Sequence, residues 1–286
     1  MKKFGLLIIG GVLAFYFRSN IQQLYWNVFN GLPQVTQKLS DELLQPNTSL
    51  NAPTPLRQEE TAQNHSGELF PDNVIAWTNS ERKKDGAAAL TPNAALTRAA
   101  LAKVNDMFKY QYFEHTAPDG TKASDLATRE SYKFIIIGEN LALGNFGGDK
   151  ELVQAWMNSP GHRANILNKS YIDIGVAVKQ GMFEGHMTWL AVQEFGKPSS
   201  VCPQADALLK ASIDRNKGLL AGDKSQLDAK HTEIEQMNQK WGNEYNQKVT
   251  EFNALVDNYN TLIRDTKTLV DNYNTQVRAY NTCALQ

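Results

Sequence analysis

Apolar and polar positions divide the chain into four stretches with different spacings. Phe4–Phe17 is an uncharged run near the start, and residues 45–68 are mainly polar. Residues 69–198 show first helical and then strand spacing, whereas apolar residues recur every seven positions after Pro203. These patterns predict an export segment, a linker, a folded domain and a long helical region, in that order.

The prediction of where the protein is located rests on the apolar run near the N-terminus. Its length fits an export signal, whose apolar part spans about 7–15 residues, and is short for a transmembrane helix of about 17–25. Residues 1–31 are therefore expected to be either a cleaved signal or an anchor. The small-residue spacing of Val12-Leu13-Ala14 favours cleavage, whereas Arg18 and interfacial aromatic residues such as Trp26 favour an anchor. We expect an exported protein, either secreted or membrane-anchored through this segment and facing outside the cytoplasm.

Residues 32–68 are predicted to be a flexible linker. Within its polar part, residues 45–68, Leu50 and Leu56 are the only large apolar residues, and there is no aromatic residue. Such a segment buries too little surface to offset the entropy lost on ordering.

The middle of the chain, residues 69–198, is predicted to be one α+β domain. Four helices are expected there: one from Asp72 to Asp85-Gly86, one after the cap Thr91-Pro92, and two at Ser124–Glu130 and Asp149–Asn158, the last stopped by Pro160-Gly161. Alternating apolar residues then predict two strands, at 172–178 and 187–195. Helices followed by a strand hairpin indicate a sheet that is covered by helices.

Three side chains of this domain are candidates for chemistry: His115, Glu139 and His162. Two imidazoles and one carboxylate suit a divalent ion such as zinc with one position left open. They suit equally well a hydrogen-bonded polar cluster without a metal. Ser159 lies three residues before His162, and a base beside a hydroxyl is the minimum for acyl transfer. A serine before Pro-Gly is, however, a common helix stop, and no G-x-S-x-G turn is present. The catalytic assignment therefore stays open, with Ser159 as the candidate.

Five segments in a fixed order carry a family resemblance. They are FEHTAPDG, GENLA, VQAWMNSPGHRANIL, IGVAV and WLAVQEFG, within Leu69–Pro198. Together they resemble the CAP superfamily of cysteine-rich secretory, antigen 5 and pathogenesis-related 1 proteins, and most of all its bacterial extracytoplasmic branch. The resemblance implies an α-β-α sandwich with an open groove lined by two histidines and two acidic residues. His115, Glu139 and His162 match three of these positions, and the fourth falls at or near Ser159.

The resemblance leaves the function open, since family members have been linked to divalent-ion binding, lipid or sterol binding and proteolysis. We expect a module whose groove, formed by His115, Glu139, Ser159 and His162, binds a small ligand, a lipid or a divalent ion held by the two histidines and Glu139. The alternative is a secreted hydrolase, a serine- or metal-assisted peptidase or esterase, although an enzyme is not favoured. A net charge of -1 and a pI near 6.5 exclude a strongly basic nucleic-acid-binding protein.

The C-terminal region, residues 202–286, has a sustained heptad pattern. One set of apolar residues recurs every seven positions: Ile213, Leu220, Leu227, Ile234 and Trp241. A second set alternates spacings of four and three: Tyr245, Val249, Phe252, Val256, Tyr259, Ile263, Thr266, Val270, Tyr273, Val277 and Tyr280. This spacing is typical of helices that pack in a coiled coil.

The turn signal Gly242-Asn243 lies midway between Cys202 and Cys283, the only two cysteines. An antiparallel coiled-coil hairpin folded there brings the cysteines together, and in an exported protein they would form a disulfide. The rival structure is one unbroken helix that dimerises in parallel, leaving each cysteine without an intrachain partner. Either form would give the domain an arm for a cell-envelope partner or for self-association.

Overall fold

The computed structural model of the chain describes residues 50–58 and 67–285. They form two compact units, one ending at Cys202 and the other running from Pro203 to Leu285. The predicted export segment and most of the predicted linker lie outside the described residues. Within the described part, no helix is long and apolar enough to span a membrane.

The first unit is built on a mixed sheet with the strand order β1-β4-β6-β5-β3, in which β2 also pairs with β4. Its three long strands are antiparallel neighbours: β4 (Phe134–Gly144), β5 (Asp173–Phe183) and β6 (His186–Pro198). The short strands β1 (Leu50–Asn51), β2 (Leu56–Arg57) and β3 (Thr91–Pro92) pair in parallel with its margins. The predicted hairpin is confirmed as β5 and β6, whereas β4 was not predicted.

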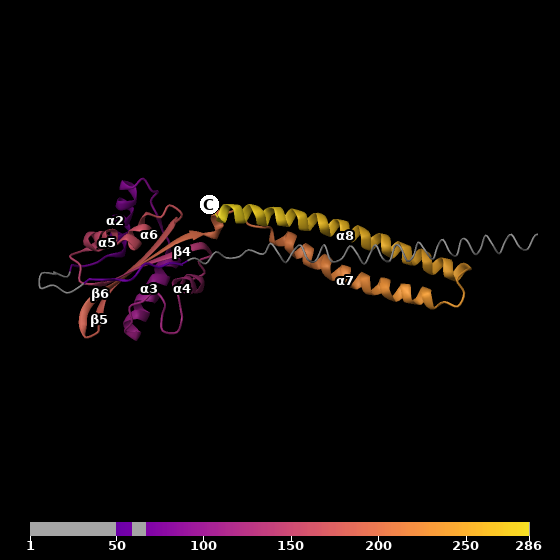
Figure 1. Cartoon of the computed structure of the whole chain (residues 1–286), viewed down its shortest axis with the longest axis horizontal. Coiled ribbons are helices and arrows are strands. Elements are labelled where there is room, and N and C mark those ends of the chain that lie inside the picture. The colour runs from indigo at the N-terminus through magenta and orange to yellow at the C-terminus, as the bar shows by residue number, and fades with distance from the viewer. Residues whose placement is uncertain (1–49, 59–66, 286) are drawn as a thin grey trace, which may run out of the picture. The chain divides into compact units, whose positions relative to one another are not determined.

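Helices cover both faces of this sheet, which confirms the expected α-β-α sandwich (Figure 1). On one face lie α2 (Pro71–Lys84), α5 (Asp149–Asn158) and α6 (Pro160–Leu167), packed through one large apolar cluster. On the other face lie α3 (Ala94–Tyr110) and α4 (Ala123–Arg129), packed through two smaller clusters. Because β4 alternates its side chains between the faces, neighbouring residues of this strand enter different layers.

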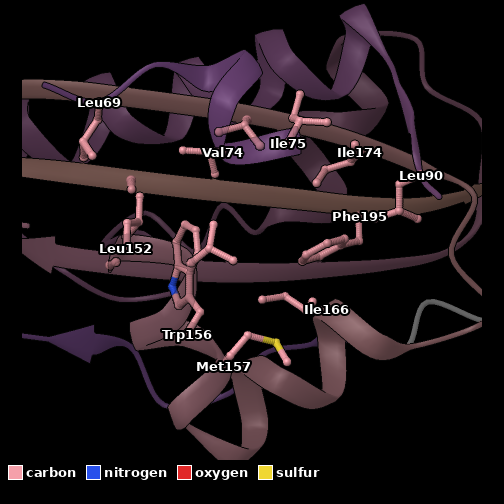
Figure 2. Close-up of a cluster of buried hydrophobic side chains, with 14 of the residues drawn as sticks. Leu69, Val74, Ile75, Leu90, Leu152, Trp156, Met157, Ile166, Ile174 and Phe195 are labelled. Carbon is pink, nitrogen blue, oxygen red and sulfur yellow. The ribbon is translucent and has the colours of Figure 1, made fainter. Parts of the chain in front are cut away.

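The largest apolar cluster surrounds Trp156, a fully buried residue of α5 (Figure 2). Val74 and Ile75 reach it from α2, and Ile174 and Phe195 from the sheet. The indole Nε1 of Trp156 donates a hydrogen bond of 3.2 Å to the carbonyl of Leu141, so its polar atom is satisfied inside the core. This bond also fixes α5 against β4, the strand that carries Glu139.

Two predicted helix starts are wrong, whereas the predicted end of the helix Asp149–Asn158 is confirmed. α2 begins after Phe70, so Asp72 lies in its first turn, where a negative charge favours the helix dipole. Thr91-Pro92 forms β3, and Asn93 caps α3 through its side chain. Pro160 does stop α5, but it also starts α6, because proline is well suited to the first helical position.

The predicted linker is wrong for residues 50–58. Leu50–Asn51 and Leu56–Arg57 pair with β4, so this segment belongs to the sheet. Its composition indicates little buried apolar surface, but strand pairing uses backbone groups that composition does not reveal. The remainder of the predicted linker, residues 32–49 and 59–66, lies outside the described residues.

The second unit is an antiparallel pair of long helices, α7 (Ala207–Gln236) and α8 (Asn243–Ala284). The chain turns between them, and Gly242 caps α8 with φ of 97°, a value that glycine adopts readily. The single unbroken helix is therefore wrong. Within this unit, Lys230 pairs with Glu251 at 2.9 Å and Lys248 with Glu233 at 2.5 Å across the two helices.

The predicted seam lies between these helices, with two exceptions. Trp241 is 71% exposed in the turn, and Asn274 is buried beside Tyr273, which is only partly buried against Ile213 and Val270. Cys202 and Cys283 are both disulfide-bonded, and as the only two cysteines they bond to each other, as predicted. The disulfide therefore joins the two ends of the hairpin sequence.

Candidate functional site

His115 and Glu139 form the first half of the site. His115 follows the C-terminus of α3, and its Nδ1 lies 2.6 Å from Oε1 of Glu139 on β4. Glu139 is fully buried and His115 is 9% exposed. The preceding Gly138 is required for close packing, because a Cβ there would lie 2.0 Å from Oη of Tyr171. The structure thus brings two of the predicted residues into direct contact.

Sequence reasoning missed a second buried carboxyl group, that of Glu194. It lies directly opposite Glu139 on the neighbouring strand β6, and both residues are fully buried. Burial, the charge of Glu139 and a hydrogen bond between the two side chains raise the pKa of Glu194 well above its ordinary value. Burial beside a second carboxyl group therefore favours the protonated form of Glu194. The signal in the sequence was the acidic residue in the mainly apolar strand segment WLAVQEF.

Lys103 on α3 brings a positive charge to this pair. It is 1% exposed, and its Nζ donates to the carbonyl of His115 at 2.8 Å and contacts Oη of Tyr112 at 3.3 Å. The pKa of Lys103 is lowered, mainly by its burial. The nearby carboxyl groups of Glu139 and Glu194 act in the opposite direction and offset part of this effect. Lys103 thus holds the loop that carries His115 and balances the buried charge of Glu139.

His162 and Ser159 form the second half of the site, on the other face of β4. His162 lies on α6, and its Nδ1 is 2.8 Å from Oγ of Ser159, the residue between α5 and α6. The side chain of Asn140 donates to the backbone carbonyl of His162 at 3.2 Å, and Asn165 donates to the carbonyl of Glu139 at the same distance. These amides fix α6 against β4.

The electrostatic environment keeps His162 neutral. Burial, followed by the positive charge of His115, lowers the pKa of His162 to about 4, with the backbone of Leu141 acting in the opposite direction. The influence of His115 shows that the two imidazoles are close enough to interact. Nε2 of His162 is buried and has no hydrogen-bond partner among the described residues. Oε2 of Glu139 and the carboxyl oxygens of Glu194 are also buried, with no partner there beyond the contact between the two carboxyl groups.

Pro53 lies between the two halves. Nε2 of His115 donates to the carbonyl oxygen of Pro53, and a Cβ built on Gly161 of α6 would lie 2.6 Å from Cβ of the same proline. Both ring nitrogens of His115 face oxygen acceptors, an arrangement that the doubly protonated ring satisfies. The four predicted groove residues are thus distributed around a short segment from residues 50–58.

The positions of these side chains can be compared with the two predicted chemistries, metal binding and acyl transfer. Within the described residues, no group of three or more His, Cys, Asp or Glu side chains is placed to hold a metal ion, and Nε2 of His115 is occupied by Pro53. For acyl transfer, Ser159 does contact His162, but Glu139 orients His115 instead. A base with a pKa of about 4 is also weak at neutral pH. In this geometry, Ser159, His162 and Glu139 do not form one connected triad.

Comparison with known proteins identifies the domain. The sequence profile of the cysteine-rich secretory protein family, CAP, matches residues 75–195. Among curated proteins, the chain is 34% identical to the uncharacterized protein YkwD of Bacillus subtilis over 145 residues, which are 50% of this chain and 54% of YkwD. It is 31% identical to the uncharacterized membrane protein YlbC of the same organism over 37% of this chain and 30% of YlbC. The chain thus spans about half or less of these relatives.

Two solved structures align with about half of this chain. A Bacillus anthracis extracellular protein containing an SCP domain aligns with a TM-score of 0.38 and 27% identity, over 46% of this chain and 45% of that one. An outer surface protein of Borrelia burgdorferi aligns with a TM-score of 0.39 and 22% identity, over 48% and 99%. The profile match contains Glu139, Ser159 and His162, together with His115 and Glu194. Residues 75–195 of this chain are a domain of the cysteine-rich secretory protein family.

Proposed function

We propose that the chain is an extracytoplasmic CAP module whose groove, lined by His115, Glu139, Ser159 and His162, binds a small ligand. One observation carries this proposal: Nε2 of His162 is a buried polar atom without a partner among the described residues. A buried polar atom that lacks a hydrogen bond is costly, so a ligand that supplies one gains affinity.

The environment of the site suits a neutral or weakly polar ligand with few polar groups. Neutral His162 offers a nitrogen acceptor or donor according to its tautomer, whereas the carboxyl group of Glu139 is already in contact with His115 and Glu194. The surrounding apolar clusters limit the number of polar contacts that the ligand must make. A small molecule, a lipid headgroup or a short neutral peptide segment meets these requirements.

A divalent ion is the second candidate ligand, and the present geometry fits it poorly. A zinc ion needs about three protein donors, and His115 would have to release Pro53 to become one of them. The residues that would hold the ion are His115, Glu139 and His162, and Ser159 would add no charge. Zinc therefore remains a prediction that titration decides.

The disulfide and the apolar segment Phe4–Phe17 support export. Disulfides persist in oxidising compartments, and Cys202 and Cys283 are bonded in this structure. We infer that the module works outside the cytoplasm, either secreted or tethered by its N-terminal segment. The hairpin of α7 and α8 would then be an arm toward an envelope partner or a second copy, with the exposed Trp241 at its turn.

Native mass spectrometry of the exported full chain tests the groove. We expect a bound small molecule, or zinc taken up on titration, in the wild-type protein and loss of at least about tenfold in occupancy in the His162→Gln variant, because the imidazole nitrogen is removed. The matched control is His231→Gln, which changes a histidine on α7 instead. Equal occupancy in all three proteins, or no bound species and no zinc uptake, would contradict the proposal.

A further inference from the structure

The segment Leu50–Gln58, here called the strap, runs along β4 and contacts both halves of the site. Its ends pair in parallel with β4, at Ile137–Gly138 and at Ala142–Leu143. Between these points, four strap residues, 52–55, face three residues of β4 and do not pair with them. Two of the four are prolines, which have no backbone N–H to give to a strand. The strap therefore arches over the part of β4 that carries Glu139.

The centre of the arch contacts both halves of the site. The carbonyl of Pro53 accepts a hydrogen bond from Nε2 of His115, and its ring lies against Gly161, the residue before His162. A segment added only to extend the sheet would instead continue the backbone pairing along β4. Pro53 is placed as a ligand would be, with one polar contact and one apolar contact.

Two glycines of the domain make room for the strap. A Cβ on Gly161 would lie 2.6 Å from Cβ of Pro53, and a Cβ on Gly144 would lie 2.7 Å from Cβ of Gln58. Real Cβ atoms do not approach other atoms so closely, so any side chain at either position would displace the strap. The surface formed by Gly144 and Gly161 therefore has room for an extended chain that lies close to it.

Arg57 fastens the C-terminal end of the strap. Its Nη1 lies 2.8 Å from Oε2 of Glu184, in the turn between β5 and β6, and its guanidinium lies 6.0 Å and 5.9 Å from the ring centroids of Phe113 and Phe183. The ion pair is exposed to solvent, where such contacts are weak. We expect these contacts of Arg57 to favour the strap in its observed position. Because they are weak, they can also break and let the strap leave β4.

We propose that the groove is a binding site for an extended, proline-containing peptide, and that the strap is its intramolecular occupant. This inference rests on the groove function proposed above and names the class of ligand. The peptide pairs with the margin of β4, gives a carbonyl oxygen to His115 and places a proline ring against Gly161. Another ligand reaches Nε2 of His115 only after the strap has left, so the strap competes with external ligands.

Chemical modification of His115 in the full chain measures strap opening. Diethyl pyrocarbonate reacts with an accessible imidazole nitrogen, and peptide mapping reports each histidine separately. We expect slow modification of His115 in the wild type and a rate on the order of five to ten times higher in Arg57→Glu, since the ion pair becomes a repulsion and the ring contacts are lost. His231 serves as the internal reference.

Two variants control this comparison. Arg57→Glu combined with Glu184→Arg exchanges the charges and should restore slow modification. Arg98→Glu breaks another surface ion pair, the 2.6 Å contact of Arg98 with Glu130, and should leave the rate at His115 unchanged. Gly161→Ala opens the strap by a different route, because its Cβ overlaps Pro53, and it should also raise the rate.

A peptide of residues 50–58 tests binding from outside. Added to the Arg57→Glu protein, it should protect His115 again, and the same peptide with Pro53→Trp should not, because the larger ring cannot fit against Gly161. The inference is overturned if Arg57→Glu and Gly161→Ala both leave His115 as slow as in the wild type, or if the native peptide gives no protection. These measurements need no natural ligand, so their failure is distinguishable from an empty groove in native mass spectrometry.

Discussion

Glu139 and Glu194 face each other in the interior beside Lys103. Two ionised carboxylates at neighbouring cross-strand positions would repel, and burial strengthens that repulsion. The raised pKa of Glu194 favours its neutral form, which relieves this repulsion. The remaining charge of Glu139 then lies near one lysine and contacts His115. At the residue scale, the packing of the two carboxyl groups depends on the proton carried by Glu194.

Replacement of each carboxyl group by an amide separates their roles. Glu194→Gln should leave the free energy of unfolding at pH 7.5 unchanged or raised by up to about 1 kcal/mol, because the amide donates without having to keep a proton. Glu139→Gln should lower it by about 2 kcal/mol or more, since Lys103 loses its counter-charge and the acceptor of His115 becomes neutral. Urea unfolding of both variants measures the difference. Equal destabilisation by the two changes would contradict the protonated state of Glu194.

His162 makes stability depend on pH in a defined direction. Its pKa falls from 6.5 to about 4 on folding, so the unfolded chain binds the extra proton between these values. Its contribution to stability is complete above about pH 6.5 and is lost, by about 1 kcal/mol per pH unit, as pH falls toward 4. Glu194 acts oppositely, because its raised pKa stabilises the folded state at low pH and that stabilisation is lost as pH rises.

The His162→Gln variant isolates this effect. The difference in unfolding free energy between wild type and variant should shrink as pH is lowered from about 7 to about 4.5, because the variant has no proton to exclude. Urea unfolding at several pH values measures it, and the contribution of Glu194 cancels in the difference. A difference that is constant with pH would show that His162 is not held neutral by its burial.

Among the elements, β4 organises the site because it lies between two helical layers. Glu139 points toward α3, where His115 and Lys103 lie, and Asn140 points toward α6, where it holds His162. Successive residues of a strand point to opposite faces, so one strand can position both halves. Its margin also pairs with the strap. The same element therefore sets the spacing of the histidines and receives the segment that covers them.

The helical hairpin combines a long apolar seam with a disulfide. Its seam buries residues of both helices, and Cys202 and Cys283 bond across a long stretch of sequence. In the chain-entropy view, closing a loop of about 80 residues contributes up to about 4 kcal/mol. The disulfide should therefore matter more to the hairpin than any one of its surface ion pairs, which are exposed to solvent and contribute little.

Reduction of this disulfide should lower the melting temperature of α7 and α8 by roughly 15 to 30 °C. Hydrogen exchange followed by mass spectrometry locates the change, since amides of α7 and α8 should lose protection while those of β4 to β6 keep it. The Cys202→Ser and Cys283→Ser double variant should match the reduced protein. Unchanged protection of the two helices would show that their seam alone sets the stability.

For the whole molecule, the hairpin predicts that two copies of the chain are not linked by a disulfide. Because α7 and α8 bury their apolar positions against each other, and both cysteines are bonded within the chain, no cysteine is available to join two copies. On a non-reducing denaturing gel, the oxidised protein should run as a monomer, slightly faster than the reduced one. A disulfide-linked dimer would contradict the intrachain bond and favour the parallel two-chain alternative.

The sequence by itself determined the division of the chain, the type of most of its elements and the family of its middle domain. The heptad spacing from Ile213 to Val277 and the Gly242-Asn243 turn predicted the hairpin and its disulfide, because these signals are local and repeat many times. The motifs around His115, Glu139 and His162 also led to the prediction of a shared groove, and the structure shows the contact between His115 and Glu139. Their assignment as metal ligands stays a prediction.

Only the tertiary structure decided which groups meet. Glu194 joins the site because two strands place it opposite Glu139, a relation between residues far apart in the sequence that no local pattern contains. The strap entered the groove although its composition predicts a linker, because its contacts are backbone pairing, one carbonyl and the space left by glycines. Spacing and composition report the apolar burial of side chains along one element, whereas register and backbone contacts arise only when distant elements pack together.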